Sequence, residues 1–468
     1  MSKRNNIFKI IILLCALVSI PTAVYYIGQK TYFFNRAYQS IFGTKADFII
    51  NLTDSYKAKG YSWSNLAQGG EEKEEMLNAV RLQVKKLEPS YIRIDHVYDF
   101  YEPIKRDASG NLVYNWEKLD REIEIILSTG AKPHLSLSYM PPALSSGSEV
   151  DLPQSWNDWK AITRETIEHV SGKDGLAIEN VYYEVWNEPD LFGEFTTSGT
   201  KNYLTLYKYA SLGAGEAKNV LPYKIGGPAT TALYESWFKD FFKFIKKENL
   251  QVDFYSWHRY SKNIANFDED VVKIKKWLLE YPEYKNIEFI ISESGHNSEN
   301  DAKYDNEFSA IHTLAIYTAT FQRIPKIFTF EIKDGPGDKQ FWGRWGLLTH
   351  ESFGIPIEKP RYKSIEFLNR MKGEWYSVLG EGTWVKAMAT TKDGTIRVLI
   401  VNYDQFGKHI ENVPIHFINI PYKIFTVRRI EFLGETQKDQ IEISGTQWST
   451  THLMQPNSAV IIEITPLR

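Results

Sequence analysis

Short apolar runs alternate with longer amphipathic segments through the first three quarters of the chain. The apolar runs are rich in β-branched and aromatic residues, and the segments between them space their apolar residues as a helix does. Eight runs are expected to be strands: Asp47–Asn51, Tyr91–Asp95, Pro133–Tyr139, Val181–Trp186, Tyr223–Gly227, Val252–Trp257, Ile287–Ser292 and Ile327–Ile332. Helices are expected at Glu71–Lys86, Trp116–Ser128, Ser155–Val170, Asn202–Ala217, Glu235–Asn249, Asp268–Leu279 and Phe308–Gln322.

This alternation predicts an α/β fold with parallel strands, because parallel neighbours need a crossover segment between them. Strands that are buried on both faces read as continuous apolar runs, as most of these do. Eight strand and helix units predict a closed (β/α)8 TIM barrel, which we expect over residues 45–372.

The pattern changes at about Gly373, where helical spacing ends. Strands are expected at Trp384–Thr390, Thr395–Tyr403, His416–Ile420, Ile424–Phe432, Ile441–Ser444 and Ala459–Ile464. The first two are joined by Thr391-Lys-Asp-Gly394, which is typical of a hairpin turn. Residues 373–468 therefore predict a C-terminal β-sandwich domain.

The N-terminus has the pattern of a targeting segment. Lys3, Arg4 and Lys9 precede the uncharged stretch Ile10–Ile27. Its length is at the short end for a membrane span, and a cleaved signal peptide is the alternative. Because Pro21 makes a poor cleavage site, we expect an N-terminal membrane anchor helix in residues 1–30 and a linker over 31–44. The basic flank would then stay cytoplasmic, which makes the rest of the chain extracytoplasmic; signal cleavage would make it secreted.

Composition narrows the possible partners and cofactors. The 55 basic and 58 acidic residues nearly balance without a basic run, so nucleic acid is not an expected partner. The one cysteine, Cys15, lies in the N-terminal apolar stretch, and the ten histidines form no HxH or HExxH pattern. No metal and no cofactor are therefore expected. The aromatic content of 14% suits either a large aromatic core or a protein that handles glycans.

Two carboxylates end two of the predicted strands. Glu188 follows the fourth strand in the segment Trp186-Asn-Glu-Pro189, and Glu293 ends the seventh. The carboxyl ends of barrel strands meet at one rim, where active sites form. Hydrolysis of a glycosidic bond needs two carboxyl groups, one of which protonates the leaving oxygen. Asn187, beside Glu188, could donate to a sugar 2-hydroxyl.

These motifs support a family resemblance. Trp-Asn-Glu-Pro on the fourth strand, with Glu on the seventh, resembles clan A of the retaining glycoside hydrolases. Finer features are similar to family 39 of that clan: Leu66-Ala-Gln-Gly-Gly-Glu71, Tyr91-Ile-Arg-Ile-Asp-His96, Asp253-Phe-Tyr-Ser-Trp-His-Arg-Tyr260, and Gly346-Leu-Leu348 followed by Lys359-Pro360.

The resemblance covers about residues 45–468. It implies a retaining mechanism in which Glu293 is the nucleophile and Glu188 the acid/base. Members of the family act on β-xylosides, α-L-iduronides or bacterial exopolysaccharides, so the expected partner is a carbohydrate substrate.

Supporting residues are expected around this pair. Arg93 either lies behind the carboxylates and lowers the pKa of the nucleophile, or forms a structural ion pair with Glu184. Tyr260 could hydrogen-bond Glu293, and His258 could contact sugar hydroxyls, unless both pack at the barrel rim. Further substrate contacts are expected from His96, His134, Tyr139 and Trp342.

The sequence departs from the family in two places. Ser294-Gly295 follows the nucleophile where an aromatic residue is usual, and the eighth strand, Phe328-Thr-Phe-Glu-Ile-Lys-Asp334, lacks the tryptophan that often floors the sugar site. We expect Trp342 or Trp345 in the next loop to take that place.

Two other functions are compatible with the same fold. One is a membrane-anchored glycan-binding protein that has lost catalysis, which the presence of both carboxylates disfavours. The other is a metal-dependent barrel hydrolase, which would be sensitive to chelators.

Overall fold

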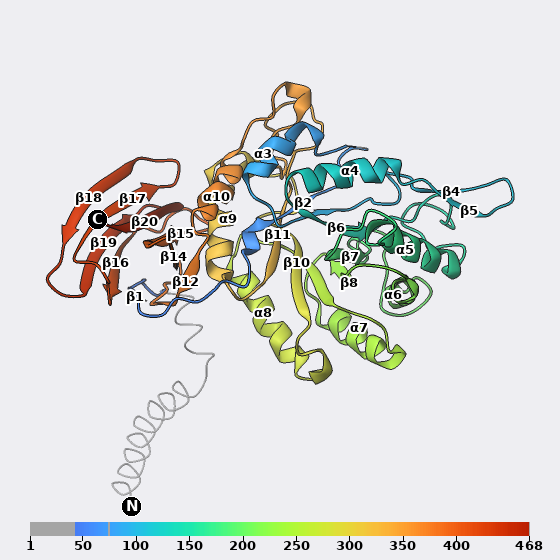
Figure 1. The fold of residues 1–468 in the computed structure, drawn as a ribbon, viewed down its shortest axis with the longest axis horizontal. Helices are drawn as coiled ribbons and strands as arrows, with labels where there is room; N and C mark the ends of the chain where they lie inside the picture. The colour runs from blue at the N-terminus through green and yellow to red at the C-terminus, as the bar shows by residue number, and fades with distance from the viewer. Residues whose placement is uncertain (1–42, 74, 468) are drawn as a thin grey trace, which may run out of the picture.

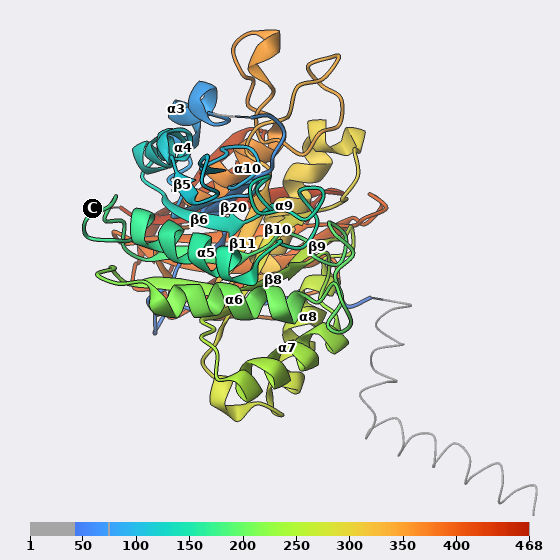
Figure 2. The same cartoon turned by 90° about the vertical axis from the view of Figure 1, so that its right-hand side faces the viewer.

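A closed barrel of eight parallel strands forms the larger part of the protein (Figures 1 and 2). The computed structural model describes residues 43–73 and 75–467. The barrel strands are β2 (Asn65–Gln68), β3 (Tyr91–Ile94), β6 (Lys132–Leu137), β7 (Val181–Val185), β8 (Tyr223–Thr230), β9 (Phe254–Tyr260), β10 (Glu288–Gly295) and β11 (Lys326–Phe330). The strands β11 and β2 pair to close the barrel, which confirms the predicted α/β class and TIM barrel.

Helices surround this barrel. They are α3 (Arg81–Lys86), α4 (Glu117–Ser128), α5 (Trp156–Val170), α6 (Tyr203–Glu216), α7 (Glu235–Glu248), α8 (Ala265–Leu278), α9 (Glu307–Thr320) and α10 (Pro360–Asn369). Local capping fixes several of their starts: the side chain of Ser155 accepts the backbone N–H of Asp158 at the start of α5, and Pro360 opens α10. A short hairpin, β4 (Ile104–Arg106) with β5 (Leu112–Tyr114), lies between β3 and α4.

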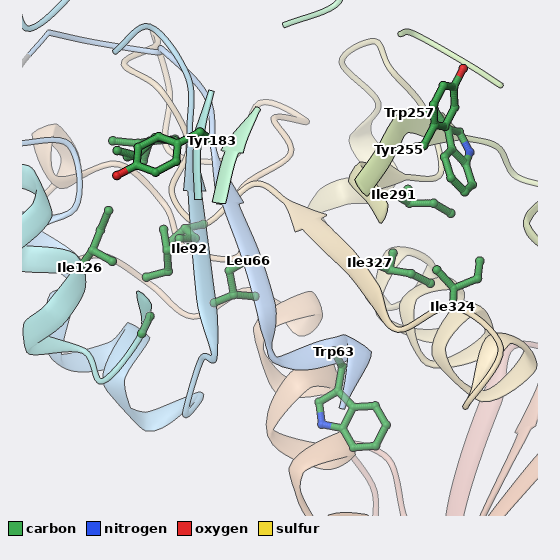
Figure 3. Close-up of a cluster of buried hydrophobic side chains, with 14 of the residues drawn as sticks. Trp63, Leu66, Ile92, Ile126, Tyr183, Tyr255, Trp257, Ile291, Ile324 and Ile327 are labelled. Atoms are coloured by element: carbon green, nitrogen blue, oxygen red, sulfur yellow. The ribbon is translucent and has the colours of Figure 1, made fainter. Parts of the chain in front are cut away.

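Apolar side chains fill the space between strands and helices. Figure 3 shows Leu66 and Ile92 on adjacent strands, with Ile126 on the helix that covers them. Inside the barrel a separate cluster contains Phe254 and Phe328, which close the barrel interior below the rim. A packed interior leaves only the rim available for ligands, as in other TIM barrels.

The expected helix over Glu71–Lys86 forms only in its last part. A 3-10 turn occupies Asn78–Val80, and α3 begins at Arg81. Residues Gly69–Glu71 instead border a cavity at the rim, so this segment serves as a loop.

The predicted first barrel strand was wrong. The run Asp47–Asn51 forms β1 (Phe48–Asn51), which pairs with two C-terminal strands outside the barrel. Its burial alternates, with Phe48 and Ile50 buried and Ile49 40% exposed, as expected of a strand with one solvent face. The true first strand, β2, is buried throughout but too short, and too polar at Asn65 and Gln68, to stand out in the sequence.

The C-terminal residues form a second domain made of sheets, as predicted. A six-stranded sheet has the order β12-β14-β15-β20-β17-β18, and a four-stranded sheet has the order β13-β1-β16-β19. The strands are β12 (Glu374–Tyr376), β13 (Val378–Leu379), β14 (Val385–Lys392), β15 (Thr395–Asn402), β16 (Glu411–Ile418), β17 (Ile424–Glu431), β18 (Thr436–Glu442), β19 (Gln447–Met454) and β20 (Ser458–Pro466). The two sheets share one apolar cluster, to which β1 contributes Phe48 and Ile50.

The barrel and the sheet domain are packed together through α9. Met388, Leu399 and Val401 on the six-stranded sheet belong to the same apolar cluster as Leu314 of α9. Figure 1 shows this sheet beside α9 and α10. The sheet domain is therefore fixed to one side of the barrel.

The expected membrane anchor and most of the expected linker lie outside the described residues. Within residues 43–73 and 75–467, no helix is both long enough and apolar enough to cross a bilayer.

We predict that Ile50→Ala lowers the free energy of unfolding by about 2–4 kcal/mol, because it removes a buried side chain from the core between the two sheets. The matched control is Ile49→Ala on the same strand, which should change it by less than about 0.5 kcal/mol. Urea denaturation followed by circular dichroism measures both. Equal effects of the two substitutions would contradict the assignment of β1 to the sheet domain.

Candidate active site

Two carboxylates from opposite sides of the barrel converge at its rim. Glu188 follows β7, and Glu293 lies near the end of β10. Nδ1 of His258, on β9, lies 2.8 Å from Oε1 of Glu188 and 3.5 Å from Oε2 of Glu293. A carboxylate oxygen of Glu188 lies within 4.8 Å of one of Glu293. Both glutamates border a cavity of about 570 Å³.

Arg93 bonds one member of this pair, Glu293, together with Glu184 and Asn187. Its guanidinium donates from Nη1 to Oε1 of Glu293 at 2.9 Å, from Nε to Oε2 of Glu184 at 2.7 Å, and from Nη2 to Oδ1 of Asn187 at 2.7 Å. The Arg93 side chain is fully buried. Both expectations for Arg93 therefore hold together: it contacts the candidate nucleophile and forms an interior ion pair with Glu184.

Opposing effects act on the pKa of Glu293. Burial raises the pKa of this carboxyl, and the nearby negative charge of Glu188 acts in the same direction. The positive charges of His258 and Arg93 oppose that rise. The hydroxyl of Tyr260 also donates to Oε2 of Glu293 at 2.8 Å, and a hydrogen bond to the charged form favours ionisation. Burial keeps the pKa of Tyr260 well above its usual range, so it remains a donor.

Glu184 is a permanent anion beneath the site. Burial alone would raise its pKa, but Arg93 and His134 hold the pKa of Glu184 well below its usual range. Nε2 of His134 lies 3.8 Å from Oε2 of Glu184. Two anions, Glu184 and Glu293, thus share the one guanidinium of Arg93.

Two predicted contact residues lie too deep to reach a sugar. His134 is fully buried, and its ring is stacked on Tyr182 at 5.4 Å, below the cavity. His258 is also fully buried, and its Nδ1 faces the two carboxylates. Burial lowers the pKa of His258, but the charges of Glu293 and Glu188 outweigh it and raise the pKa. The structure therefore gives both histidines electrostatic contacts in place of the expected sugar contacts.

The other side of the cavity is held by a polar network. Asn187 donates from Nδ2 to the Tyr139 hydroxyl at 2.8 Å and to Oδ2 of Asp95 at 3.4 Å. Nδ1 of His96 lies 2.7 Å from Oδ2 of Asp99. These bonds fix the orientation of side chains that border the cavity. Six of the predicted site residues line it: His96, Tyr139, Asn187, Glu188, Tyr260 and Glu293.

Of the two tryptophans expected at the sugar site, Trp345 lines the cavity and Trp342 does not. Trp345 and Phe330 both border it, with their ring centroids 5.4 Å apart. Trp342 does not line the cavity. The guanidinium carbon of Arg344 lies 5.2 Å from the ring centroid of Trp342. Of the two alternatives, the structure therefore favours Trp345 over Trp342 as the aromatic residue of this loop that borders the cavity. Phe330 lies on the strand where the usual tryptophan is absent.

Loop residues complete the lining, and no periodic pattern in the sequence marks them. Glu71 forms an ion pair with Arg344, whose guanidinium lies 3.8 Å from the ring centroid of Trp345. The other lining residues that sequence reasoning missed include Leu191, Phe192, Thr231, Arg259, Ser298, Glu299 and Asn300.

The donor set at the rim is unsuited to a metal ion. Glu188, His258 and Glu293 offer ligand atoms close together, but the guanidinium of Arg93 already contacts Glu293 and would repel a cation. At a second cluster, Glu72, His350 and Glu351, the ammonium group of Lys333 contacts both glutamates. Lys333 therefore already supplies the positive charge that a metal ion would bring to the cluster of Glu72, His350 and Glu351.

Comparisons with known proteins show the family of the chain. The family model for glycosyl hydrolases family 39 matches residues 56–417. Over 374 residues the chain is 27% identical to a β-xylosidase of Caldicellulosiruptor saccharolyticus, and the match covers 72% of each chain. Over 366 residues it is 26% identical to a β-xylosidase of Geobacillus stearothermophilus, and the match covers 70% of each chain.

The fold is also found among solved structures. A monomeric β-xylosidase from Caulobacter crescentus CB15 superimposes with a TM-score of 0.75 at 18% identity, covering 90% of this chain and 100% of that one. The family match extends over both the barrel and part of the sheet domain. The chain belongs to glycosyl hydrolases family 39 and is a glycoside hydrolase.

Proposed function

We propose that the enzyme hydrolyses β-linked glycosides of an oligosaccharide or polysaccharide with retention of anomeric configuration. The observation that carries this proposal is the approach of the Glu188 and Glu293 carboxylate oxygens to within 4.8 Å. Retaining glycosidases hold their carboxyl groups about 5–5.5 Å apart, whereas inverting enzymes leave about 6.5–9.5 Å for a water molecule. The names of the two β-xylosidase relatives support the β-linked substrate class.

In the first step Glu293 attacks the anomeric carbon and the glycosidic C–O bond breaks. Glu188 gives its proton to the departing oxygen, so the leaving group departs as an alcohol. An ester then joins the sugar to Glu293. In the second step Glu188 takes a proton from water, the hydroxide attacks the same carbon, and the ester bond breaks. Both glutamates return to their starting protonation states, and one water molecule is consumed.

The surrounding residues hold the pair ready for this reaction. Arg93 and Tyr260 each bond one oxygen of Glu293, which fixes the carboxylate plane and favours its ionised form. Nδ1 of His258 lies within ion-pair distance of both glutamates, at 2.8 Å from Glu188 and 3.5 Å from Glu293. Asn187 lies beside Glu188 at the cavity wall, where it can donate to a sugar hydroxyl in place of its long 3.4 Å bond to Asp95.

The site of action follows from the N-terminal sequence. The basic residues Lys3, Arg4 and Lys9 before Ile10–Ile27 support a membrane-anchored enzyme whose barrel is extracytoplasmic. A tethered enzyme of this kind meets glycans at the surface of its own cell, including its own exopolysaccharide. Protease accessibility of the barrel on intact cells tests this placement, and protection of the barrel would contradict it.

We predict that the roles of the two glutamates separate with the leaving group. Glu188→Gln should lower kcat/KM about 10²–10⁴-fold on an unactivated β-glycoside, because the leaving oxygen is no longer protonated. On a 2,4-dinitrophenyl β-glycoside, whose leaving group needs no proton, kcat/KM should remain close to that of the parent. Glu293→Gln should lose activity on both substrates, because no nucleophile remains. Equal losses on both substrates for the two variants would contradict the assignment.

We predict that Tyr260→Phe moves the acidic limb of the kcat/KM profile to higher pH. The substitution removes a donor to ionised Glu293, so the pKa of Glu293 rises. Because the reaction needs the anion, activity is present above that pKa and is lost as pH falls through it. At neutral pH the loss should be about tenfold, as expected for one hydrogen bond to a charged group. An unchanged acidic limb would show that Tyr260 does not stabilise the nucleophile.

Glu184→Gln should move the same limb in the opposite direction. Glutamine still accepts the Nε hydrogen bond of Arg93, but it removes the anion that competes for the guanidinium. Arg93 then stabilises ionised Glu293 more strongly, the pKa of Glu293 falls, and activity persists to lower pH. A shift to higher pH would mean that Glu184 acts by orienting Arg93, and not through its charge.

A further inference from the structure

Leu191 and Phe192 form an apolar wall of the catalytic cavity. Both side chains border the cavity that holds Glu188 and Glu293, and they are 55% and 41% exposed. Single exposed apolar residues are common on protein surfaces, but adjacent ones that border a cavity mark a surface that a ligand covers. The reaction steps proposed above give this wall no role.

The wall is fixed to the candidate acid/base. The backbone N–H groups of Leu191 and Phe192 both donate to the carbonyl oxygen of Glu188, at 2.9 and 2.7 Å. Nε1 of Trp186 donates to the carbonyl oxygen of Phe192 at 3.0 Å, and the ring of Phe192 meets that of Tyr139 edge to face at 5.5 Å. The turn that carries Glu188 therefore also sets the position of both apolar side chains.

The loop after β8 extends this wall. The carboxylate of Asp190 accepts the backbone N–H of Thr231 at 3.0 Å and also accepts the Thr231 hydroxyl. Thr231 and Ala232 border the cavity, and their strand pairs with β7. Apart from Glu188, the residues of these two loops that border the cavity are uncharged. The cavity beside Glu188 therefore favours a neutral ligand with an apolar face.

A second apolar wall lies across the barrel. Phe330 ends β11, and Trp345 lies in the loop that follows. In the closed barrel β7 is the fourth neighbour of β11 in both directions, so the two walls lie on opposite sides of the rim. The ring of Phe330 lies 6.4 Å from that of Tyr260, which donates to Glu293. One wall thus adjoins Glu188, and the other adjoins the candidate nucleophile.

The stereochemistry of the displacement gives each wall a different part of the substrate. A nucleophile attacks the anomeric carbon from the side opposite the leaving oxygen, and the acid/base protonates that oxygen. The departing group therefore lies on the side of Glu188, against Leu191 and Phe192. The sugar that becomes attached to Glu293 lies on the side of Phe330.

We propose that Leu191 and Phe192 form the leaving-group subsite and pack on the face of a neutral sugar ring that departs in the first step. The proposal rests on the proposed function and names part of its substrate: a β-glycoside whose leaving group is itself an uncharged sugar. Contact with the departing ring raises kcat/KM only for substrates that carry such a ring. A substrate without a ring in this position gains nothing from the wall.

The test compares leaving groups with and without a ring, on the full-length chain. A panel of β-D-xylosyl, β-D-glucosyl, β-D-galactosyl and β-D-mannosyl fluorides identifies the sugar that the parent cleaves. The ring-bearing substrates are the β-1,3- and β-1,4-linked disaccharides of that sugar. The test variant is Leu191→Ala with Phe192→Ala. The matched control is Leu279→Ala with Phe406→Ala, which changes the same residue types at exposed positions outside the cavity.

We expect the test variant to lower kcat/KM on the disaccharide at least about tenfold, because the departing ring loses its apolar contact. On the fluoride, whose leaving group is a single atom, the change should be less than about twofold. The control should match the parent on both substrates. Trp345→Ala on the opposite wall should lower kcat/KM on both, because both substrates share the sugar on that side.

Three results would overturn the proposal: an unchanged kcat/KM of the test variant on the disaccharide, an equal loss on disaccharide and fluoride, or a parent that cleaves a fluoride and neither disaccharide. An equal loss would mean that the wall shapes the cavity and does not contact the leaving group. A parent that cleaves no fluoride of the panel would instead contradict the proposed function, on which the subsite depends.

Discussion

The guanidinium of Arg93 is the constraint on which the rest of the site depends. It is buried and bonds Glu184, Asn187 and Glu293 at the same time, so it joins three strands of the barrel at one point. A buried cation needs such partners, because removing one partner of a buried pair leaves an uncompensated charge that costs about 3–5 kcal/mol. The planar five-donor fork of arginine can satisfy three acceptors at fixed angles, which an ammonium group on a flexible stem cannot do.

Around that point the charges of the site become ordered in depth. Glu184 lies deepest as a permanent anion, Arg93 compensates it, and Glu293 lies above with a pKa that burial raises and the nearby cations oppose. Glu188 lies at the cavity wall, and the ring of His258 contacts both Glu188 and Glu293. The barrel thus brings two carboxylates together at one rim, which is the arrangement that the proposed double displacement requires.

The sequence predicted those parts of the site that lie at the ends of strands with a clear apolar pattern. Glu188, Asn187, Tyr260 and Glu293 end apolar runs whose periodicity was clear, so their common rim followed from barrel topology. Depth along a strand was harder to predict: His134 lies early on β6 and is directed into the packed interior. Loop residues such as Arg344 and Glu299 have no periodicity that could place them.

Two of the errors in the fold have related causes. The strand β1 has the apolar alternation of a one-faced strand, but its position before the barrel suggested membership of the barrel. Its pairing with β16, more than 300 residues later, leaves no local signal in the sequence. The strand β19 was missed because its exposed positions are polar and only alternate residues are shielded, which resembles a loop. In both cases a long-range contact determined the structure.

The stereochemistry of the first product tests the double displacement most directly. Time-resolved proton NMR of a β-glycoside, recorded before mutarotation, distinguishes the two anomers of the released sugar. The geometry of Glu188 and Glu293 predicts that the β anomer appears first and the α anomer later. Initial release of the α anomer would show that water attacks directly, and it would contradict a nucleophilic role for Glu293.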